Sequence, residues 1–146
     1  MSLKTIFNQH VPAIIAPQLA ILAEMVPAYL EAVALTDFGE DEQPPSDSEF
    51  APEAVFEAFE VCSEFLKNNR DLLEQAHDNH DYSFRQAGHD LWLTRNGHGA
   101  GFWDRGLDTE INQKELGELL SDACKTLGSR SVYLNEDDNL VYFDLG

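Results

Sequence analysis

The sequence predicts a single α+β domain in which N-terminal helices pack on an antiparallel β-hairpin–helix–β-hairpin (ββαββ) unit. Two patterns predict this class. Apolar residues recur every three or four positions in the first half, and apolar and polar residues alternate around turn signals in the second half. The length of 146 residues suits one domain, so residues 1–146 are expected to fold as a unit.

Residues 1–36 are expected to be helical. Residues 3–11 can form a short helix, and Pro17 suits the first turn of a second helix with apolar side chains along one side. Pro27 should kink this second helix because proline lacks the backbone N–H. A change to Asp, Glu, Gly, Pro and Ser then predicts an acidic loop over residues 37–51.

The clearest helix is predicted over residues 52–80. Pro52 suits a first-turn position, and apolar residues follow at spacings of mainly three and four. The other face carries glutamates at the same spacings, so they form one charged row along the helix. This acidic ridge consists of Glu53, Glu57, Glu60 and Glu64.

Residues 86–146 are expected to form the ββαββ unit. Its helix is predicted over residues 109–127, with Gly128 as the C-terminal stop. Its last hairpin pairs residues 131–134 with residues 140–143 around an acidic turn. This unit is expected to lie beneath the N-terminal helices.

The first hairpin of the unit is predicted from residues 89–95 and 100–105, which flank Asn96-Gly97. Asn-Gly is the strongest short hairpin signal. Loops of two and of four residues both fit, and they give different cross-strand partners. The pairs are His89 with Asp104 for the short loop, and Trp92 with Trp103 and Asp90 with Arg105 for the longer loop.

The charge of the chain limits its partners. Nine Lys and Arg against 27 Asp and Glu give a net charge of −18, which repels both nucleic acid and anionic membranes. The same charge attracts a basic protein surface. Acidity also confers solubility, but a solubility coat would mix both signs, whereas no Lys or Arg occurs between Thr5 and Leu66.

This segregation predicts an acidic surface that contacts a basic host protein. A nucleic-acid-processing or defence enzyme is a suitable target, because its DNA groove would accept side chains that imitate the charge of DNA. The residues predicted to bind this partner are Asp37, Glu40, Asp41, Glu42, Glu53, Glu57, Glu60 and Glu64.

A small metal-dependent hydrolase or nuclease is an alternative function. His89, His98 and Asp104 are the candidate acid–base groups, and Arg95 or Arg105 can stabilise developing negative charge. In the predicted hairpin His98 lies at the tip and His89 at the far end of a strand, about 20 Å apart at roughly 3.3 Å per residue. The two histidines would then need a third element to bring them together.

Metal and cofactor motifs are weak in this sequence. His77 and His80 are three residues apart and can present two metal ligands on one helix face, but residues 77–81 also suit a helix cap and a turn. Gly97 and Gly99 lack the phosphate-loop pattern. We therefore expect no cofactor.

The sequence favours a cytoplasmic protein. Cys62 and Cys124 are too few and too far apart for a disulfide framework, so both are expected to be free core thiols. The apolar stretch over residues 11–35 is interrupted by Glu24, Glu31 and prolines, which argues against a signal peptide or a membrane-spanning segment.

The run from Gln86 to Arg105, with the core GHDLWLTRNGHGAGFWDR, resembles a run found in a family of small uncharacterised bacteriophage and prophage proteins. The resemblance continues through the following helix to the final hairpin. It implies a protein made inside an infected bacterial host cell. It carries over no activity and no site residues.

Three hypotheses follow from the sequence. The first is an acidic accessory protein that binds a basic host protein. The second is the metal-dependent hydrolase or nuclease. The third is a non-catalytic structural protein that oligomerises through its hairpin and aromatic residues, and the sequence leaves the oligomeric state open.

Overall fold

The computed structural model describes residues 16–38 and 49–144, and the α+β class predicted from the sequence is confirmed. The helix expected over residues 3–11 and residues 39–48 of the predicted acidic loop lie outside the described residues. The elements are α2 (Ala16–Asp37), α3 (Pro52–His80), α4 (Phe84–Arg95), the 3-10 helix η3 (Phe102–Asp104), β1 (Glu110–Ile111), β2 (Lys114–Glu115), α5 (Leu116–Lys125), β3 (Val132–Asn135) and β4 (Leu140–Phe143).

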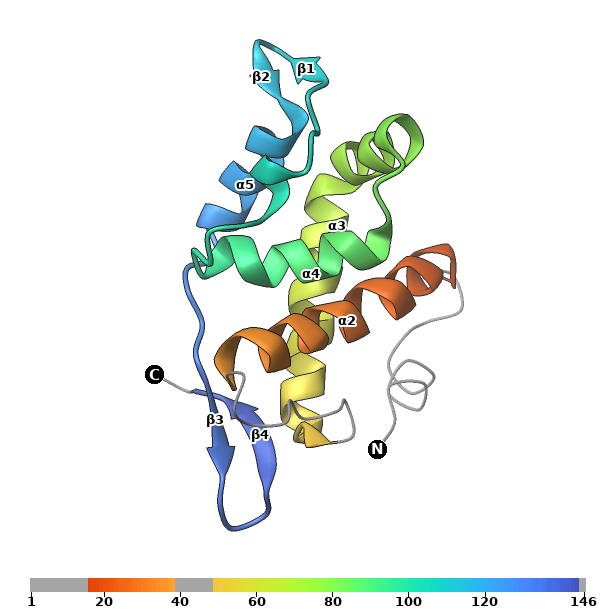
Figure 1. Ribbon diagram of the computed structural model, residues 1–146. Helices are drawn as coiled ribbons and strands as arrows, with labels where there is room; N and C mark the ends of the chain where they lie inside the picture. Colours follow the sequence, from red (N-terminus) through yellow and green to blue (C-terminus); the bar gives the residue numbers. More distant parts are fainter. Residues whose placement is uncertain (1–15, 39–48, 145–146) are drawn as a thin grey trace.

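Helix α3 is the central element, and α2, α4 and α5 all contact it (Figure 1). The prediction of a helix over residues 52–80 is confirmed. Pro52 opens the helix, and Asp81 ends it with a left-handed conformation (φ 54°). Asn69 departs from helical angles (φ −129°, ψ 23°), and its side-chain amide donates to the Phe65 carbonyl at 3.0 Å.

The first predicted hairpin is wrong. Residues 89–95 belong to helix α4, and residues 100–105 hold a bend and η3 instead of a strand. The helix begins after Ser83, whose hydroxyl accepts a hydrogen bond from the backbone N–H of Gln86 at 3.0 Å. Ser-x-x-Gln is a capping-box pattern, so a local signal for this helix is present in the sequence.

Asn96-Gly97 ends a helix here instead of joining two strands. Gly97 has φ 66°, its N–H donates to the Thr94 carbonyl at 3.3 Å, and the N–H of His98 donates to the Leu93 carbonyl at 3.0 Å. These two bonds form a Schellman motif, which needs a positive φ at this position, as a tight hairpin turn also does. The same dipeptide therefore suits both structures.

The residue pairs expected from that hairpin were derived from the wrong structure. Trp92 is buried and donates to the Thr36 hydroxyl at 2.9 Å, whereas Trp103 is 56% exposed. Asp90 and Arg105 do form an ion pair, at 2.8 Å. They meet because η3 returns the chain alongside α4, which the two elements' contacts confirm.

Helix α5 is shorter than the predicted helix over residues 109–127. The first residues of that range instead form the small β1–β2 ladder, and the connecting residues Asn112 and Gln113 both have positive φ, at 52° and 74°. Two successive positive φ angles are typical of a type I′ hairpin turn. Gly128 has φ 71° and follows the end of α5, as expected for a C-terminal stop.

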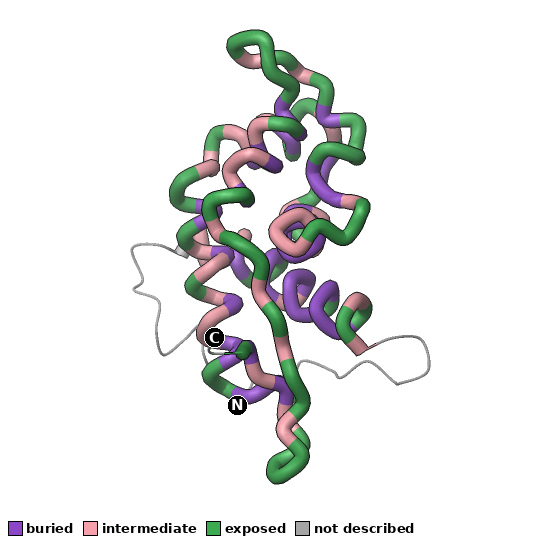
Figure 2. Tube along the Cα trace, turned by 90° about the vertical axis from the view of Figure 1, so that its left-hand side faces the viewer, coloured by how far each residue is buried: buried purple, intermediate pink, exposed green. Residues whose placement is uncertain are grey.

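The final hairpin is confirmed: β3 pairs with β4, and Tyr133 lies opposite Tyr142. A parallel bridge between Phe50 and Val141 joins β4 to the chain just before α3. The β1–β2 and β3–β4 ladders are separate sheets at opposite ends of the molecule (Figure 1), so the single ββαββ unit is not confirmed. The tip of the β3–β4 hairpin is exposed (Figure 2).

The core lies between the helices. Trp92 and Phe102 are fully buried, and the Phe102 ring stacks on Phe65 with centroids 5.6 Å apart. Cys62 and Cys124 are free and buried, which confirms the prediction of core thiols. Helix α4 thus contributes to the core on most of its sides, because it lies between α2, α3 and α5.

Helix α2 is apolar enough that its residues 18–37 would suffice, by length and composition alone, to cross a membrane. Half of that segment is buried inside the structure, mainly against α4. Pro27 lies within this helix, which continues beyond it to Asp37.

Candidate functional site

The acidic ridge runs along the N-terminal half of α3. Glu53, Glu60 and Glu64 are exposed on this helix. No Lys or Arg of the described ranges 16–38 and 49–144 forms an ion pair with these three carboxylates. Glu64 accepts one hydrogen bond, from the Asn68 amide at 3.4 Å. The ridge therefore presents negative charge to solvent from a rigid helix.

Glu57 is the exception in the acidic ridge. Both of its carboxylate oxygens accept from the Arg130 guanidinium, at 2.6 and 2.8 Å, and both side chains are less than a third exposed. The hydrogen bond to Glu57 raises the pKa of Arg130. This bidentate pair joins α3 to the chain just before β3, so Glu57 has a structural role.

Glu57→Gln should lower the free energy of unfolding by about 1–2 kcal/mol, between the values typical of exposed and buried ion pairs. Gln substitutions at Glu53, Glu60 and Glu64 should each change it by less than about 0.5 kcal/mol, since these side chains are exposed. Urea denaturation followed by circular dichroism measures both. Equal stability changes at all four positions would contradict the structural role of Glu57.

Most cations of the described chain are engaged in internal ion pairs. The pairs are Arg70–Glu74, Arg85–Glu31, Arg105–Asp90, Lys114–Asp122, Lys125–Asp122 and Arg130–Glu57. Because the acids greatly outnumber the bases, most carboxylates of the described residues have no basic partner.

Asp37 lies apart from the ridge, at the end of α2. It lines a surface pocket of about 430 Å³ with His98, Ser129, Arg130 and two polar neighbours. Partial burial raises the pKa of its carboxyl, and nearby His98 offsets this only in part. The other predicted partner-binding residues of the loop lie outside the described residues. They are Glu40, Asp41 and Glu42.

Two tyrosines of the final hairpin lie next to the start of the ridge. Tyr133 and Tyr142 stack with centroids 5.6 Å apart and planes 15° from parallel. Tyr142 donates a hydrogen bond to Asp138, which raises the pKa of the phenol to about 12. A hollow of about 170 Å³ lies between the hairpin and α3, and we call it the tyrosine hollow. It is lined by Glu53, Ala54, Glu57, Arg130, Tyr133, Tyr142 and Phe143.

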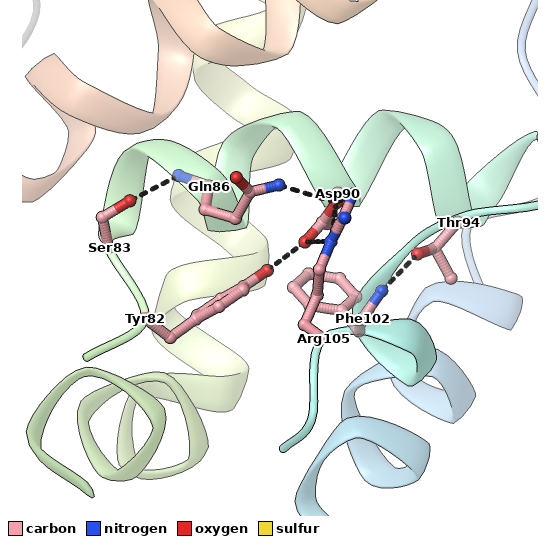
Figure 3. A network of polar contacts seen from close by, with 7 residues as sticks. All are labelled: Tyr82, Ser83, Gln86, Asp90, Thr94, Phe102 and Arg105. Atoms are coloured by element: carbon pink, nitrogen blue, oxygen red, sulfur yellow. Dashed lines mark hydrogen bonds and ion pairs between the residues drawn. The ribbon is translucent and has the colours of Figure 1, made fainter. Parts of the chain in front are cut away.

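Polar residues of α4 form hydrogen bonds and an ion pair with the chain segments before and after this helix (Figure 3). Asp90 is fully buried and accepts from Tyr82 at 2.5 Å, from the Gln86 amide at 3.1 Å and from Arg105 at 2.8 to 3.2 Å. Burial and the adjacent Asp90 carboxylate raise the pKa of Tyr82, so the phenol stays protonated and donates. Thr94 accepts from the Phe102 backbone N–H at 3.2 Å.

Arg95 also has a structural role. Its guanidinium donates to the carbonyls of Leu127 and Gly128 at 3.1 and 2.9 Å and to the Tyr29 hydroxyl at 3.1 Å. These carbonyls follow the C-terminal end of α5, where a cation is favoured. Arg95 is thus occupied by three acceptors, and the structure does not place it at a reaction centre.

The candidate metal ligands His77 and His80 have other partners. His77 stacks on Phe84 with centroids 4.6 Å apart and contacts Asp78 at 3.2 Å. His80 shares a hydrogen bond with the Thr109 hydroxyl at 2.7 Å. In the part of the chain that the structure describes, no three His, Cys, Asp or Glu side chains come together as a metal site requires.

His89 lines a pocket of about 480 Å³ between α2 and α4, together with Glu31, Arg85 and Arg105. Burial lowers the pKa of His89, so the imidazole is mainly neutral at pH 7. Its Nδ1 is buried and has no hydrogen-bond partner within the described residues. The arginines in this pocket are already paired, Arg85 with Glu31 at 2.6 Å and Arg105 with buried Asp90.

The structure places the three candidate catalytic residues in different surroundings. His89 and His98 line different pockets, and Asp104 is exposed on η3 and lines neither. The pairing of His89 with Asp104 depended on the hairpin that is now replaced by α4. The geometry therefore gives the hydrolase hypothesis no support.

Sequence reasoning missed Arg130, Tyr133 and Tyr142 as part of the surface beside the ridge. The signal for the two tyrosines was present, because a hairpin around residues 135–139 places Tyr133 opposite Tyr142. The position of Arg130 against Glu57 had no local signal, since the two residues are far apart in the sequence.

Comparisons of this chain with protein-family models, with curated proteins and with solved structures find no match.

Proposed function

We propose that this protein is an acidic accessory protein of the phage type that binds a basic host protein through the acidic ridge of α3. The observation that carries the proposal is the exposed row of Glu53, Glu60 and Glu64 on one rigid helix, with no basic partner among the described residues. Because the helix is already folded, its backbone needs no further ordering when the carboxylates bind a basic surface.

The target class follows from this charge. A nucleic-acid-processing or defence enzyme carries a basic groove that normally holds phosphates, and a row of carboxylates competes for the same groove. Nucleic acid itself would be repelled by a net charge of −18. The proposed setting is the cytoplasm of an infected bacterium.

The charge variant that tests the proposal combines Glu53→Gln, Glu60→Gln and Glu64→Gln, and it leaves Glu57 in place because Glu57 stabilises the fold. A matched control removes three exposed carboxylates at the β1–β2 end of the molecule. The control substitutions are Glu110→Gln, Glu115→Gln and Glu118→Gln. Both variants have the same net charge, so only the position of the lost charge differs.

The tagged full chain is incubated with nuclease-treated bacterial lysate at about 50 mM and at about 500 mM salt, and captured proteins are identified by mass spectrometry. The native chain and the control variant should recover the same basic nucleic-acid enzyme at low salt, and the ridge variant should lose it. Capture that persists at high salt, or that the two variants lose equally, contradicts binding through the ridge.

A further inference from the structure

We propose that the tyrosine hollow receives one arginine side chain of the basic partner, between the Glu53 carboxylate and the stacked rings of Tyr133 and Tyr142. This inference rests on the proposed function and adds the recognition mode. The hollow is about 170 Å³, below the roughly 300–1,000 Å³ of small-molecule sites. A single side chain is therefore a more suitable occupant than a nucleotide or a metabolite.

The protein itself contains an example of this recognition. The Arg130 guanidinium binds both oxygens of Glu57 and lies 5.5 Å from the centroid of the Phe143 ring. A planar cation is thus held by a glutamate of α3 on one side and an aromatic ring of β4 on the other. Carboxylate and aromatic ring are the two partners that guanidinium binds best.

A second glutamate and two further aromatic rings also line the hollow. Glu53 lies one helical turn before Glu57 on α3, and Tyr133 and Tyr142 stack across the β3–β4 hairpin. Glu53 is close enough to the Tyr142 phenol to contribute to its raised pKa. Arg130 is the one cation that lines the hollow among the described residues, and Glu57 already binds it.

The surroundings favour a charged ligand over an apolar one. Tyr133 is 44% exposed, so part of the stacked pair is accessible to a partner. The Tyr142 phenol donates to Asp138 and, like an ordinary tyrosine, is protonated at neutral pH, so negative charge in and beside the hollow comes from carboxylates. Arginine is preferred over lysine because its planar group can stack on tyrosine while it donates to a carboxylate.

The probe is a blocked tripeptide, acetyl-Gly-Arg-Gly-amide, and its neutral analogue carries citrulline in place of arginine. Each is titrated into the full native chain, and the ring resonances of Tyr133 and Tyr142 are followed by NMR. We expect saturable shifts with the arginine peptide and no saturable shifts with the citrulline peptide. Equal responses to both peptides, or no response of the two rings, would overturn the proposal.

Two substitutions test the hollow, and one of them, Tyr133→Ala, does so without removing a carboxylate of the acidic ridge. Glu53→Gln and Tyr133→Ala should each weaken peptide binding on the order of threefold, as the loss of an exposed cation–π or ion-pair contact predicts. Glu60→Gln lies outside the hollow and should leave the peptide affinity unchanged. Circular dichroism shows whether each variant is folded. If Tyr133→Ala unfolds, Glu53→Gln still tests the hollow, because glutamine has nearly the same shape as glutamate.

The lysate experiment distinguishes the two proposals. If Tyr133→Ala captures the basic partner as well as the native chain does, while the ridge variant loses it, the hollow proposal is wrong and ridge binding stands. If the ridge variant also retains the partner, the proposed function itself is wrong. Weaker capture by Tyr133→Ala with all carboxylates in place supports the hollow.

Discussion

Replacing Arg105 with alanine should lower the free energy of unfolding by about 3–5 kcal/mol, because it leaves a buried carboxylate without its cation. Asp90 is fully buried, and Arg105 donates to it from two nitrogens. Tyr82 and Gln86 would remain as its neutral donors (Figure 3). Neutral donors stabilise a carboxylate removed from water less than a paired cation does.

Asp90→Ala should also destabilise the fold, but by less, since the Arg105 side chain is 30% exposed and water can hydrate its guanidinium. The double variant should cost far less than the sum of the two single variants, because no unpaired charge is left. Urea denaturation of all four chains gives the coupling free energy, which we expect to be about 2 kcal/mol or more. Additive single effects would contradict the assignment of Asp90 and Arg105 as one structural unit.

Gly88→Ala should destabilise the protein by about 3 kcal/mol, at the upper end of the range for overpacking. A Cβ atom at position 88 would lie 2.1 Å from the backbone oxygen of Met25 and 2.8 Å from its Cα. These are backbone atoms, so α2 and α4 must separate to make room. In an unconstrained helix the same substitution is stabilising by about 0.5–1 kcal/mol, so the expected sign is reversed.

The control for this prediction is Asn68→Ala, at an exposed position of α3, where alanine should be neutral or slightly stabilising. Thermal unfolding by circular dichroism compares both variants with the native chain. A native-like melting temperature for Gly88→Ala would show that the α2–α4 crossing tolerates a wider separation than the structure has.

Much of the run between Gln86 and Arg105 has a structural role. Gly88 permits the close helix crossing, Asp90 and Arg105 join η3 to α4, and Arg95 binds the carbonyls after α5. A run rich in ionisable residues need not be catalytic, because buried ion pairs and capping interactions need the same side chains.

The sequence alone was sufficient to predict the α+β class, helix α3, the β3–β4 hairpin and the buried thiols. These features depend on local patterns: helical spacing after Pro52, alternation on both sides of residues 135–139, and apolar surroundings of Cys62 and Cys124. The row of glutamates on one face of α3 was predictable for the same reason.

Only the tertiary structure decided what residues 89–105 form and which glutamate of the ridge is structural. A helix buried on most sides has no clear polar face, so its apolar residues do not show helical spacing, and Asn96-Gly97 suits a hairpin as well as a helix end. Glu57 differs from its neighbours only because the fold brings Arg130 against it from 73 residues away. Long-range contacts of this kind have no local signal, because they depend on the packing of elements that are distant in the chain.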